Sequence, residues 1–169
     1  MGSSGNRPRR DDQIPEGGAA TIIRRIKGRS ARRYTILSGK VYGYWAHWNG
    51  YYTSACTDES GETCEGHKRK WPLKWRGYLH VRDWLTGELV HLELPGGAAR
   101  QIKSQTIQGQ DLRGLVLEVF RTSEAKHSHC RVMVHLGTIP ADDLPADKDP
   151  TDDVGKLWGH IPRKGGAPD

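Results

Sequence analysis

Two cysteines and two histidines stand close together in the first half of this chain. They are spaced as His47-x8-Cys56-x7-Cys64-x2-His67. Zinc takes four nitrogen or sulfur ligands in a tetrahedron, and a short turn with two ligands often supplies half of them. The segment between the cysteines, TDESGET, is polar and turn-forming, so a bound metal is a natural means of fixing it. The pattern therefore predicts a structural zinc site with these four ligands.

Two other interpretations of the cysteines stay open at this point. They are ordinary thiols beside surface histidines, or Cys56 and Cys64 form a disulfide. The chain has three cysteines, an odd number, which argues against a disulfide framework. The third, Cys130, alternates with Val132 and Val134 in an apolar segment, so we expect it in the core.

Cationic residues and tryptophans alternate directly after the last predicted ligand. Cations follow a phosphate backbone, and an indole face stacks on any base, so the combination favours a single nucleic-acid strand. The alternative is a solvated basic loop whose tryptophans cap the core. Outward-facing residues of the neighbouring strands extend the predicted surface. The predicted nucleic-acid-binding residues are Lys68, Arg69, Lys70, Trp71, Lys74, Trp75, Arg76, Tyr78, Arg82, Tyr42 and Tyr44.

The composition limits the classes of protein that fit. The 169 residues suit one domain with tails, and the formal charge of +6 with a pI near 9.3 favours a polyanionic partner. Only 35% of residues are hydrophobic, and 21 are glycine, so part of the chain is expected to be irregular. No signal peptide or long apolar run is present, which predicts a soluble cytoplasmic protein without a membrane partner.

Hydrophobic alternation indicates the elements that hold the predicted zinc loop. The order is strand, loop, strand, strand, helix, strand, strand, which is the order of an OB-fold. We therefore predict a mainly β protein: a five-stranded OB-like Greek-key barrel with one short helix. The Cys/His loop, residues 47–75, falls between the first two strands, where this fold binds oligonucleotides. The predicted strands are 34–45, 77–84, 88–94, 115–122 and 129–136, and the helix is 98–106.

Two tails flank the predicted barrel, which spans residues 34–138. Residues 1–33 are rich in arginine and glycine and predict a basic, flexible arm. Residues 139–169 contain seven aspartates, six of them among prolines at positions 142–153, and show no periodic pattern, which predicts an extended tail. Trp158 is its only large aromatic residue, so it is the expected contact for a protein partner.

A zinc loop carried by an OB-fold resembles the single-stranded-DNA-binding proteins of T4-type phages. The layout is also similar to the zinc-bearing OB domain of the large subunit of replication protein A. The resemblance covers about 100 residues and rests on His47, Cys56, Cys64 and His67 within the strand order above. The phage pattern has cysteine where this chain has His67. The resemblance implies a structural zinc and single-strand binding.

We therefore expect a non-catalytic protein that binds single-stranded DNA or RNA. One alternative is an accessory protein-interaction subunit of a larger nucleoprotein or mobile-element complex. Another is an enzyme in which His127 and His129 hold a metal, or Asp83 and His80 act as acid and base. The chain contains no phosphate-binding glycine loop, nucleophile elbow or HExxH motif, so we predict no catalytic residues.

Overall fold

The computed structural model describes residues 22–125 and 128–168, and this part of the chain is mainly β. It contains eight strands, three α-helices and one short 3-10 turn. The strands are β1 (Ile22–Arg25), β2 (Arg32–Ile36), β3 (Tyr42–Trp48), β4 (Thr53–Ala55), β5 (Leu73–Asp83), β6 (Leu89–Pro95), β7 (Leu115–Arg121) and β8 (Cys130–Thr138). The helices are α1 (Glu65–Lys68), α2 (Gly96–Gln105) and α3 (Thr151–Trp158).

The strands form one mixed sheet with the order β1-β6-β5-β2-β7-β8. β1 runs parallel to β6, and the other pairs are antiparallel. β3 pairs with β5 on one side and with β4 on the other. The predicted β5–β6 hairpin is confirmed, and the strands predicted at residues 115–122 and 129–136 are present as β7 and β8. The predicted first strand is interrupted at residues 37–41, so it becomes β2 and β3.

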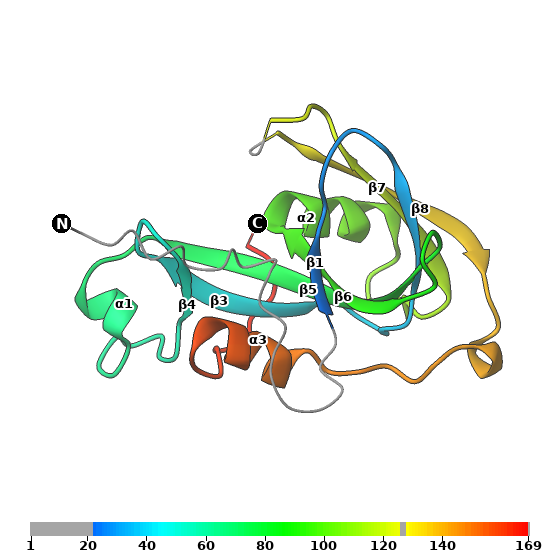
Figure 1. The fold of residues 1–169 in the computed structure, drawn as a ribbon. Coiled ribbons are helices and arrows are strands. Elements are labelled where there is room, and N and C mark those ends of the chain that lie inside the picture. The colour runs from blue at the N-terminus through cyan, green and yellow to red at the C-terminus, as the bar shows by residue number, and fades with distance from the viewer. Residues whose placement is uncertain (1–21, 126–127, 169) are drawn as a thin grey trace.

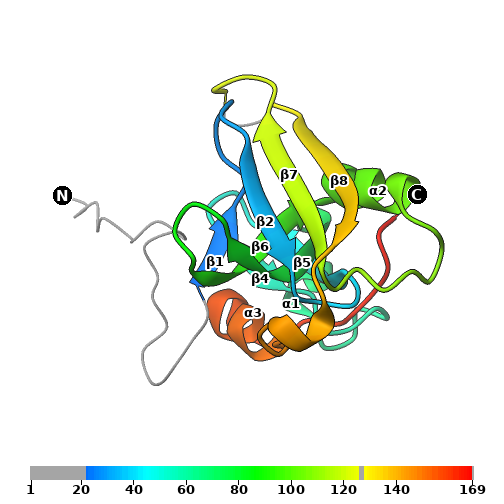
Figure 2. The ribbon, with the colours of Figure 1, turned by 90° about the vertical axis from the view of Figure 1, so that its right-hand side faces the viewer.

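The sheet is open, in contrast to the predicted closed five-stranded barrel. Among the described strands, no pairing joins β6 to β8. Helix α2 lies beside β8 instead, and the amide side chains of Gln101 and Gln105 bond its backbone (Figure 2). Gln101 bonds Cys130 O and Val132 N, each at 2.8 Å. These side chains satisfy edge groups that a closing strand would have paired.

Both faces of the central sheet are covered. On one face, α2 contributes Ala98 and Ile102 to a core with Leu79, Leu92 and Leu117. On the other face, α3 packs its apolar side onto β3 and β5, and in Figure 1 it lies beneath these strands. This second cluster consists of Tyr44, Ala46, Ala55, Tyr78, Val154 and Trp158.

The predicted extended tail at residues 139–169 is therefore wrong for its central part. Val154 and Trp158 are four residues apart, so they share one face of α3, and both are buried. The helix ends at Gly159, whose φ of 88° suits a glycine C-cap. Trp158 is 3% exposed and packs against Tyr78 of its own chain, with ring centroids 6.1 Å apart. It offers no surface to a partner in this state.

The N-terminal prediction is also corrected in part. Residues 22–25, expected in the flexible arm of residues 1–33, form β1 at the sheet edge. Arg24 in this strand donates to Asp83 at 2.6 Å and to Glu88 at 2.7 Å, which ties the edge strand to the β5–β6 hairpin. The other end of the arm enters β2 at Arg32. Residues 1–21 lie outside the described part. None of the described helices is long and apolar enough to cross a membrane.

Candidate metal centre and the surface around it

Two short structural units bring the four predicted metal ligands together. His47 lies on β3, and Cys56 directly follows β4, so the β3–β4 hairpin supplies one pair. Cys64 is the N-cap of α1 and His67 lies within that single turn, which supplies the other pair. The hairpin and α1 lie at one end of the molecule, beside β5 (Figure 1). The sequence prediction of this grouping is confirmed.

The distances between the ligand atoms match a tetrahedral site. All four atoms lie within 4.8 Å of one another. Cys56 Sγ is 4.0 Å from Cys64 Sγ and 3.7 Å from His67 Nδ1, while Cys64 Sγ is 3.4 Å from His47 Nε2. Tetrahedral zinc bonds imply about 3.8 Å between two sulfurs and about 3.6 Å between sulfur and nitrogen. Three of the separations are thus close to tetrahedral values, and the four residues could hold one metal ion.

The geometry also decides between the three interpretations of the cysteines. The thiols of Cys56 and Cys64 are free, and a disulfide would need their sulfurs about 2 Å apart. Neither cysteine is at the surface, and His47 is buried with them, so these are not ordinary exposed thiols and histidines. A buried cluster of two cysteines and two histidines is a group that can hold a metal ion.

The groups around the ligands orient them for metal binding. His47 Nδ1 lies 3.1 Å from the backbone oxygen of Trp71. A carbonyl can only accept, so Nδ1 carries the hydrogen and Nε2 is left for the metal. Gly66 packs flat against the same ring, since a Cβ at this position would lie 2.2 Å from His47 Cδ2. Of the two residues between Cys64 and His67, the second must therefore be glycine.

The two thiols differ in their electrostatics. Burial opposes ionisation of Cys64, but hydrogen bonds from His67 and from the backbone of the turn lower its pKa to about 5. Burial raises the pKa of Cys56, and the Arg163 guanidinium opposes this rise. Arg163 Nε donates to Cys56 Sγ at 3.0 Å. Both thiols therefore have donors that stabilise a thiolate, which is the form that binds metal.

Arg163 is a residue of this centre that the sequence did not indicate. Its backbone amide donates to Cys56 O at 2.8 Å, and its carbonyl accepts from Trp45 N at 3.0 Å. Its guanidinium lies 5.1 Å from the centre of the Trp45 ring. The segment around it, PRKGG, has no periodic pattern, and 107 positions separate it from Cys56. No local signal in the sequence could have placed it here.

Some of the predicted nucleic-acid-binding residues gather beside the metal centre. Lys68, Arg69 and Lys70 are exposed at and just after the C-terminal end of α1. Trp71 is half-buried, with the Arg69 guanidinium 5.6 Å from the ring centre. Lys74 is half-buried on β5, and its Nζ lies 5.1 Å from the ring centre of Trp48.

Three of the predicted stacking residues are buried, so their assignment is wrong. Trp75 is 5% exposed, and its Nε1 donates to Gly165 O at 2.9 Å. It was expected in a loop, but β5 already starts at Leu73, and alternation along the strand turns Trp75 inward. Tyr44 and Tyr78 were expected to face outward, but both are fully buried and pack with Val154 and Trp158 of α3.

The other three predicted residues are not part of one surface with the basic turn. Arg76 is half-buried and pairs with Glu93 at 3.6 Å. Tyr42 is half-buried, and its hydroxyl donates to Asp147 at 2.7 Å. Arg82 lies eight residues after Lys74 on β5, about 26 Å away along an extended strand. The predicted list therefore separates into a basic turn and residues elsewhere.

The structure adds aromatic residues that the sequence interpretation missed. Tyr51 and Tyr52, in the turn of the β3–β4 hairpin, are 87% and 50% exposed. The Asn49 side chain accepts from the backbone amides of both, which fixes the turn. Trp48 N donates to Pro72 O at 3.0 Å, so the hairpin lies against the segment after α1. We call residues 48–52 together with 68–74 the tip.

Asp83 and His80, the acid and base of the enzymatic alternative, bond to different partners. Asp83 bonds Arg24 and Arg32, whereas His80 Nδ1 accepts from the backbone amide of Lys148 at 3.1 Å. His129 is exposed at the start of β8, and His127 lies outside the described residues. Within the described part of the chain, the acid and base of that hypothesis have separate partners.

Comparison of the chain with protein-family models, with curated proteins and with solved structures finds no match. The resemblance to zinc-bearing OB-fold proteins stays a prediction. The function is therefore inferred from the side chains of the metal centre and the tip.

Proposed function

We propose that the protein is a non-catalytic binder of single-stranded nucleic acid that uses a zinc-stabilised tip. The observation that carries the proposal is the composition of the tip. Three exposed cations, Lys68, Arg69 and Lys70, stand beside four aromatic residues that keep exposed surface. The four aromatic residues are Trp48, Tyr51, Tyr52 and Trp71.

The metal centre supports a structural role for zinc. Two thiols and two imidazoles form a borderline-soft donor set, which suits zinc better than calcium or magnesium. These four residues would fill all four positions of a tetrahedral zinc, whereas a catalytic zinc needs one open position. When bound, zinc supplies no reaction here and instead joins α1 to the β3–β4 hairpin. The tip then has the fixed shape that a binding surface needs.

The physical chemistry of the tip favours a single strand over a duplex. Exposed aromatic faces stack on bases, and bases within a duplex present only their edges. The neighbouring ammonium and guanidinium groups neutralise phosphates and make binding depend on salt. Arg69 has an acidic neighbour in Glu65 at 2.5 Å, but both are exposed and such pairs are weak. Most of the cationic charge of the turn is thus open to a phosphate chain.

The strand pairing supports a relation to the OB-fold, and we infer that the sheet is an opened form of it. β2 and β3 together take the place of the first strand, followed by β5, β6, helix α2, β7 and β8. The pairs β5–β6, β2–β7 and β7–β8 agree with that topology. The tip then corresponds to the loop between the first two strands, a site of oligonucleotide binding in OB-folds.

The experiment measures zinc content together with binding of labelled oligonucleotides. We expect one zinc per chain by elemental analysis, and tighter binding of single-stranded than of duplex oligonucleotides of equal length. Tyr51→Ala should weaken single-strand binding by about 1–3 kcal/mol without loss of zinc, since its ring is almost fully exposed. DNA and RNA strands are compared in parallel.

Charge removal supplies the second readout. Changing Lys68, Arg69 and Lys70 to alanine should reduce the log–log salt slope by about 2, at about 0.7 for each phosphate contact. The matched control changes Lys40, Lys103 and Lys156, three exposed lysines away from the tip. The tip is not the binding surface if both triple variants change the salt slope equally. The same conclusion follows if Tyr51→Ala leaves single-strand affinity unchanged.

A further inference from the structure

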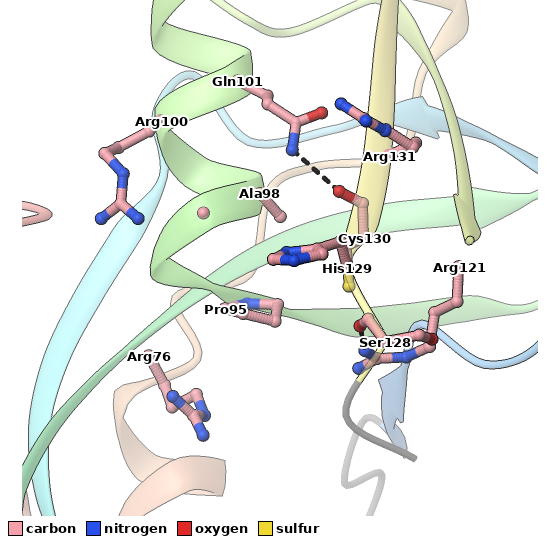
Figure 3. Close-up of a pocket in the computed structure, with 11 residues that line it drawn as sticks. Arg76, Pro95, Ala98, Arg100, Gln101, Arg121, Ser128, His129, Cys130 and Arg131 are labelled. Atoms are coloured by element: carbon pink, nitrogen blue, oxygen red, sulfur yellow. Dashed lines mark hydrogen bonds between the residues drawn. The ribbon is translucent and has the colours of Figure 1, made fainter. Parts of the chain in front are cut away.

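A second cationic site lies between helix α2 and the start of β8, apart from the metal centre. It is an open cleft of about 590 Å³. Arginines from four different elements line it: Arg76 of β5, Arg100 of α2, Arg121 of β7 and Arg131 of β8 (Figure 3). His129 lies between them in Figure 3. A cleft with this lining attracts anions.

In the described part of the chain, acidic residues do not balance this charge. None of the residues that line the cleft is acidic. Arg76 has a carboxylate partner in Glu93, which is buried and lies 3.6 Å from both Arg25 and Arg76. One carboxylate thus faces two guanidinium groups, and it also accepts from Tyr78 at 2.6 Å. The cleft keeps a net positive charge.

Arg100 and Arg121 donate to carbonyls, not to carboxylates, within the described part of the chain. Arg121 donates to Ile26 O at 2.7 Å and to Ser128 O at 2.5 Å, and carbonyls orient a guanidinium without neutralising it. Arg100 donates to the Pro168 carbonyl at 3.2 Å, and Arg131 is exposed. The Arg121 side chain is therefore held in place at one side of the cleft, and Arg100 and Arg131 are the accessible cations.

The start of α2 adds polar donors to the same cleft. Pro95 precedes the helix and provides no side-chain cap, and the first turn contains no acidic residue. Gly97 and Ala98 of that turn line the cleft. Uncapped amides at a helix start carry partial positive charge, which adds to that of the arginines. A glycine at position 97 also lets a ligand approach the backbone closely.

The lining also indicates what kind of anion enters. Guanidinium groups bind phosphates in a bidentate manner, and four of them around an open cleft suit several phosphates of one chain. Among the described residues that line the cleft there is no tryptophan, tyrosine or phenylalanine, and the imidazole of His129 is the single aromatic ring, so the cleft suits phosphates better than bases. Arg76 lies two residues after Lys74 of the tip, so both side chains are on the same face of β5. The cleft and the tip are thus two separate cationic regions that strand β5 connects.

We propose that this arginine cleft binds the phosphodiester backbone of the strand whose bases contact the tip. This inference rests on the proposed function and assigns it a second contact region. The tip would hold bases, and the cleft would hold phosphates independently of sequence.

The test removes the two accessible cations of the cleft in the full chain. The variant Arg100→Ala/Arg131→Ala leaves Arg76 and Arg121 in place, because these two hold backbone or buried partners. We expect the salt slope for a long single strand to fall by about 1.4, at about 0.7 for each contact. Zinc content and thermal melting should stay unchanged. The control Lys103→Ala/Lys156→Ala removes the same charge from exposed positions outside the cleft.

The outcomes separate this inference from the proposed function. If the salt slope of the cleft variant equals that of the wild type, or if the control variant lowers the slope by the same amount, the cleft does not bind the strand. The proposal that the tip binds the strand is unaffected by that result. If the wild-type protein binds no strand, the proposed function fails and the cleft proposal fails with it. Titration with inorganic tripolyphosphate, followed at the Gly97 amide by NMR, then reports on the cleft alone. If the Gly97 amide resonance shifts with tripolyphosphate but the protein binds no strand, the cleft is an anion site with another function. That result contradicts our assignment.

Discussion

Replacement of Arg163 by alanine tests whether the C-terminal segment belongs to the metal centre. The side chain makes one charge-assisted hydrogen bond to Cys56 Sγ at 3.0 Å and stacks on Trp45. Its backbone bonds to Cys56 and Trp45 do not depend on the side chain and should persist. The substitution thus removes one thiolate donor and one ring contact from an otherwise preserved segment.

The expected magnitude follows from these contacts. Loss of a hydrogen bond to a metal ligand typically costs 10–100-fold in metal affinity, or about 1.4–2.8 kcal/mol. The lost stacking should lower folding stability by about 0.5–1 kcal/mol, because Arg163 is only partly buried. The pKa of Cys56, already raised by burial, should rise further without the guanidinium. Metal uptake by the variant should therefore need a higher pH than uptake by the wild-type protein.

The assay is competition for zinc with a chromogenic chelator at several pH values. Lys164→Ala is the matched control, since it removes one positive charge from the neighbouring exposed residue. Arg163→Lys keeps the charge but lacks the planar Nε donor, so it should recover only part of the affinity. If Arg163→Ala and Lys164→Ala bind zinc equally well, the contact with Cys56 has no role in metal binding.

Three further predictions concern the ligand turn, the tryptophans and acid stability. Gly66→Ala should prevent stoichiometric zinc binding, because its Cβ would lie 2.2 Å from the His47 ring, whereas Gly137→Ala, with open space, should not. Trp75→Ala should lower the free energy of unfolding by about 3–5 kcal/mol in chemical denaturation, whereas Trp71→Ala should mainly weaken strand binding; the reverse pattern would contradict the burial found here. Burial, reinforced by His80, lowers the pKa of His91 in the folded protein to about 4. As the pH falls below about 6.5, the unfolded chain therefore takes up a proton on His91 before the folded protein does. Stability should then decrease by up to about 1.4 kcal/mol per pH unit down to pH 4, and His91→Gln should show a shallower decrease in urea titrations.

The metal ligands were predictable because their chemistry is local. The pair in α1 is separated by two residues, and few functions other than metal binding explain such a pair beside two more soft donors. The residue types and their spacing were therefore sufficient to predict the four ligands. Strand positions were predictable for a similar reason, because alternation directly records which residues face the core formed by Leu79, Leu92 and Leu117.

The opposite face of the sheet was not predictable from the same alternation. The pattern shows that Tyr78, His80 and His91 point away from the main core, but it does not show what covers them. The cover is the C-terminal segment, which includes α3, and its signal is three apolar residues, Val154, Leu157 and Trp158. Three apolar residues within a single eight-residue segment are too few to distinguish a docked helix from a tail. The errors at the tyrosines and in the tail therefore have one common cause.

The same segment explains why the metal centre extends beyond the loop that contains its ligands. β4 covers the edge of β3 from Ala46 to Trp48, and the C-terminal segment continues along that edge. Gly165 N donates to Gly43 O at 3.0 Å, and a Cβ on Gly43 would lie 2.1 Å from Gly165 O. This close approach requires glycine at position 43 and brings Arg163 to Cys56. Docking of α3 and closure of the metal centre are thus coupled, because one segment of the chain carries both contacts. Metal removal should consequently loosen the C-terminal segment as well as the tip.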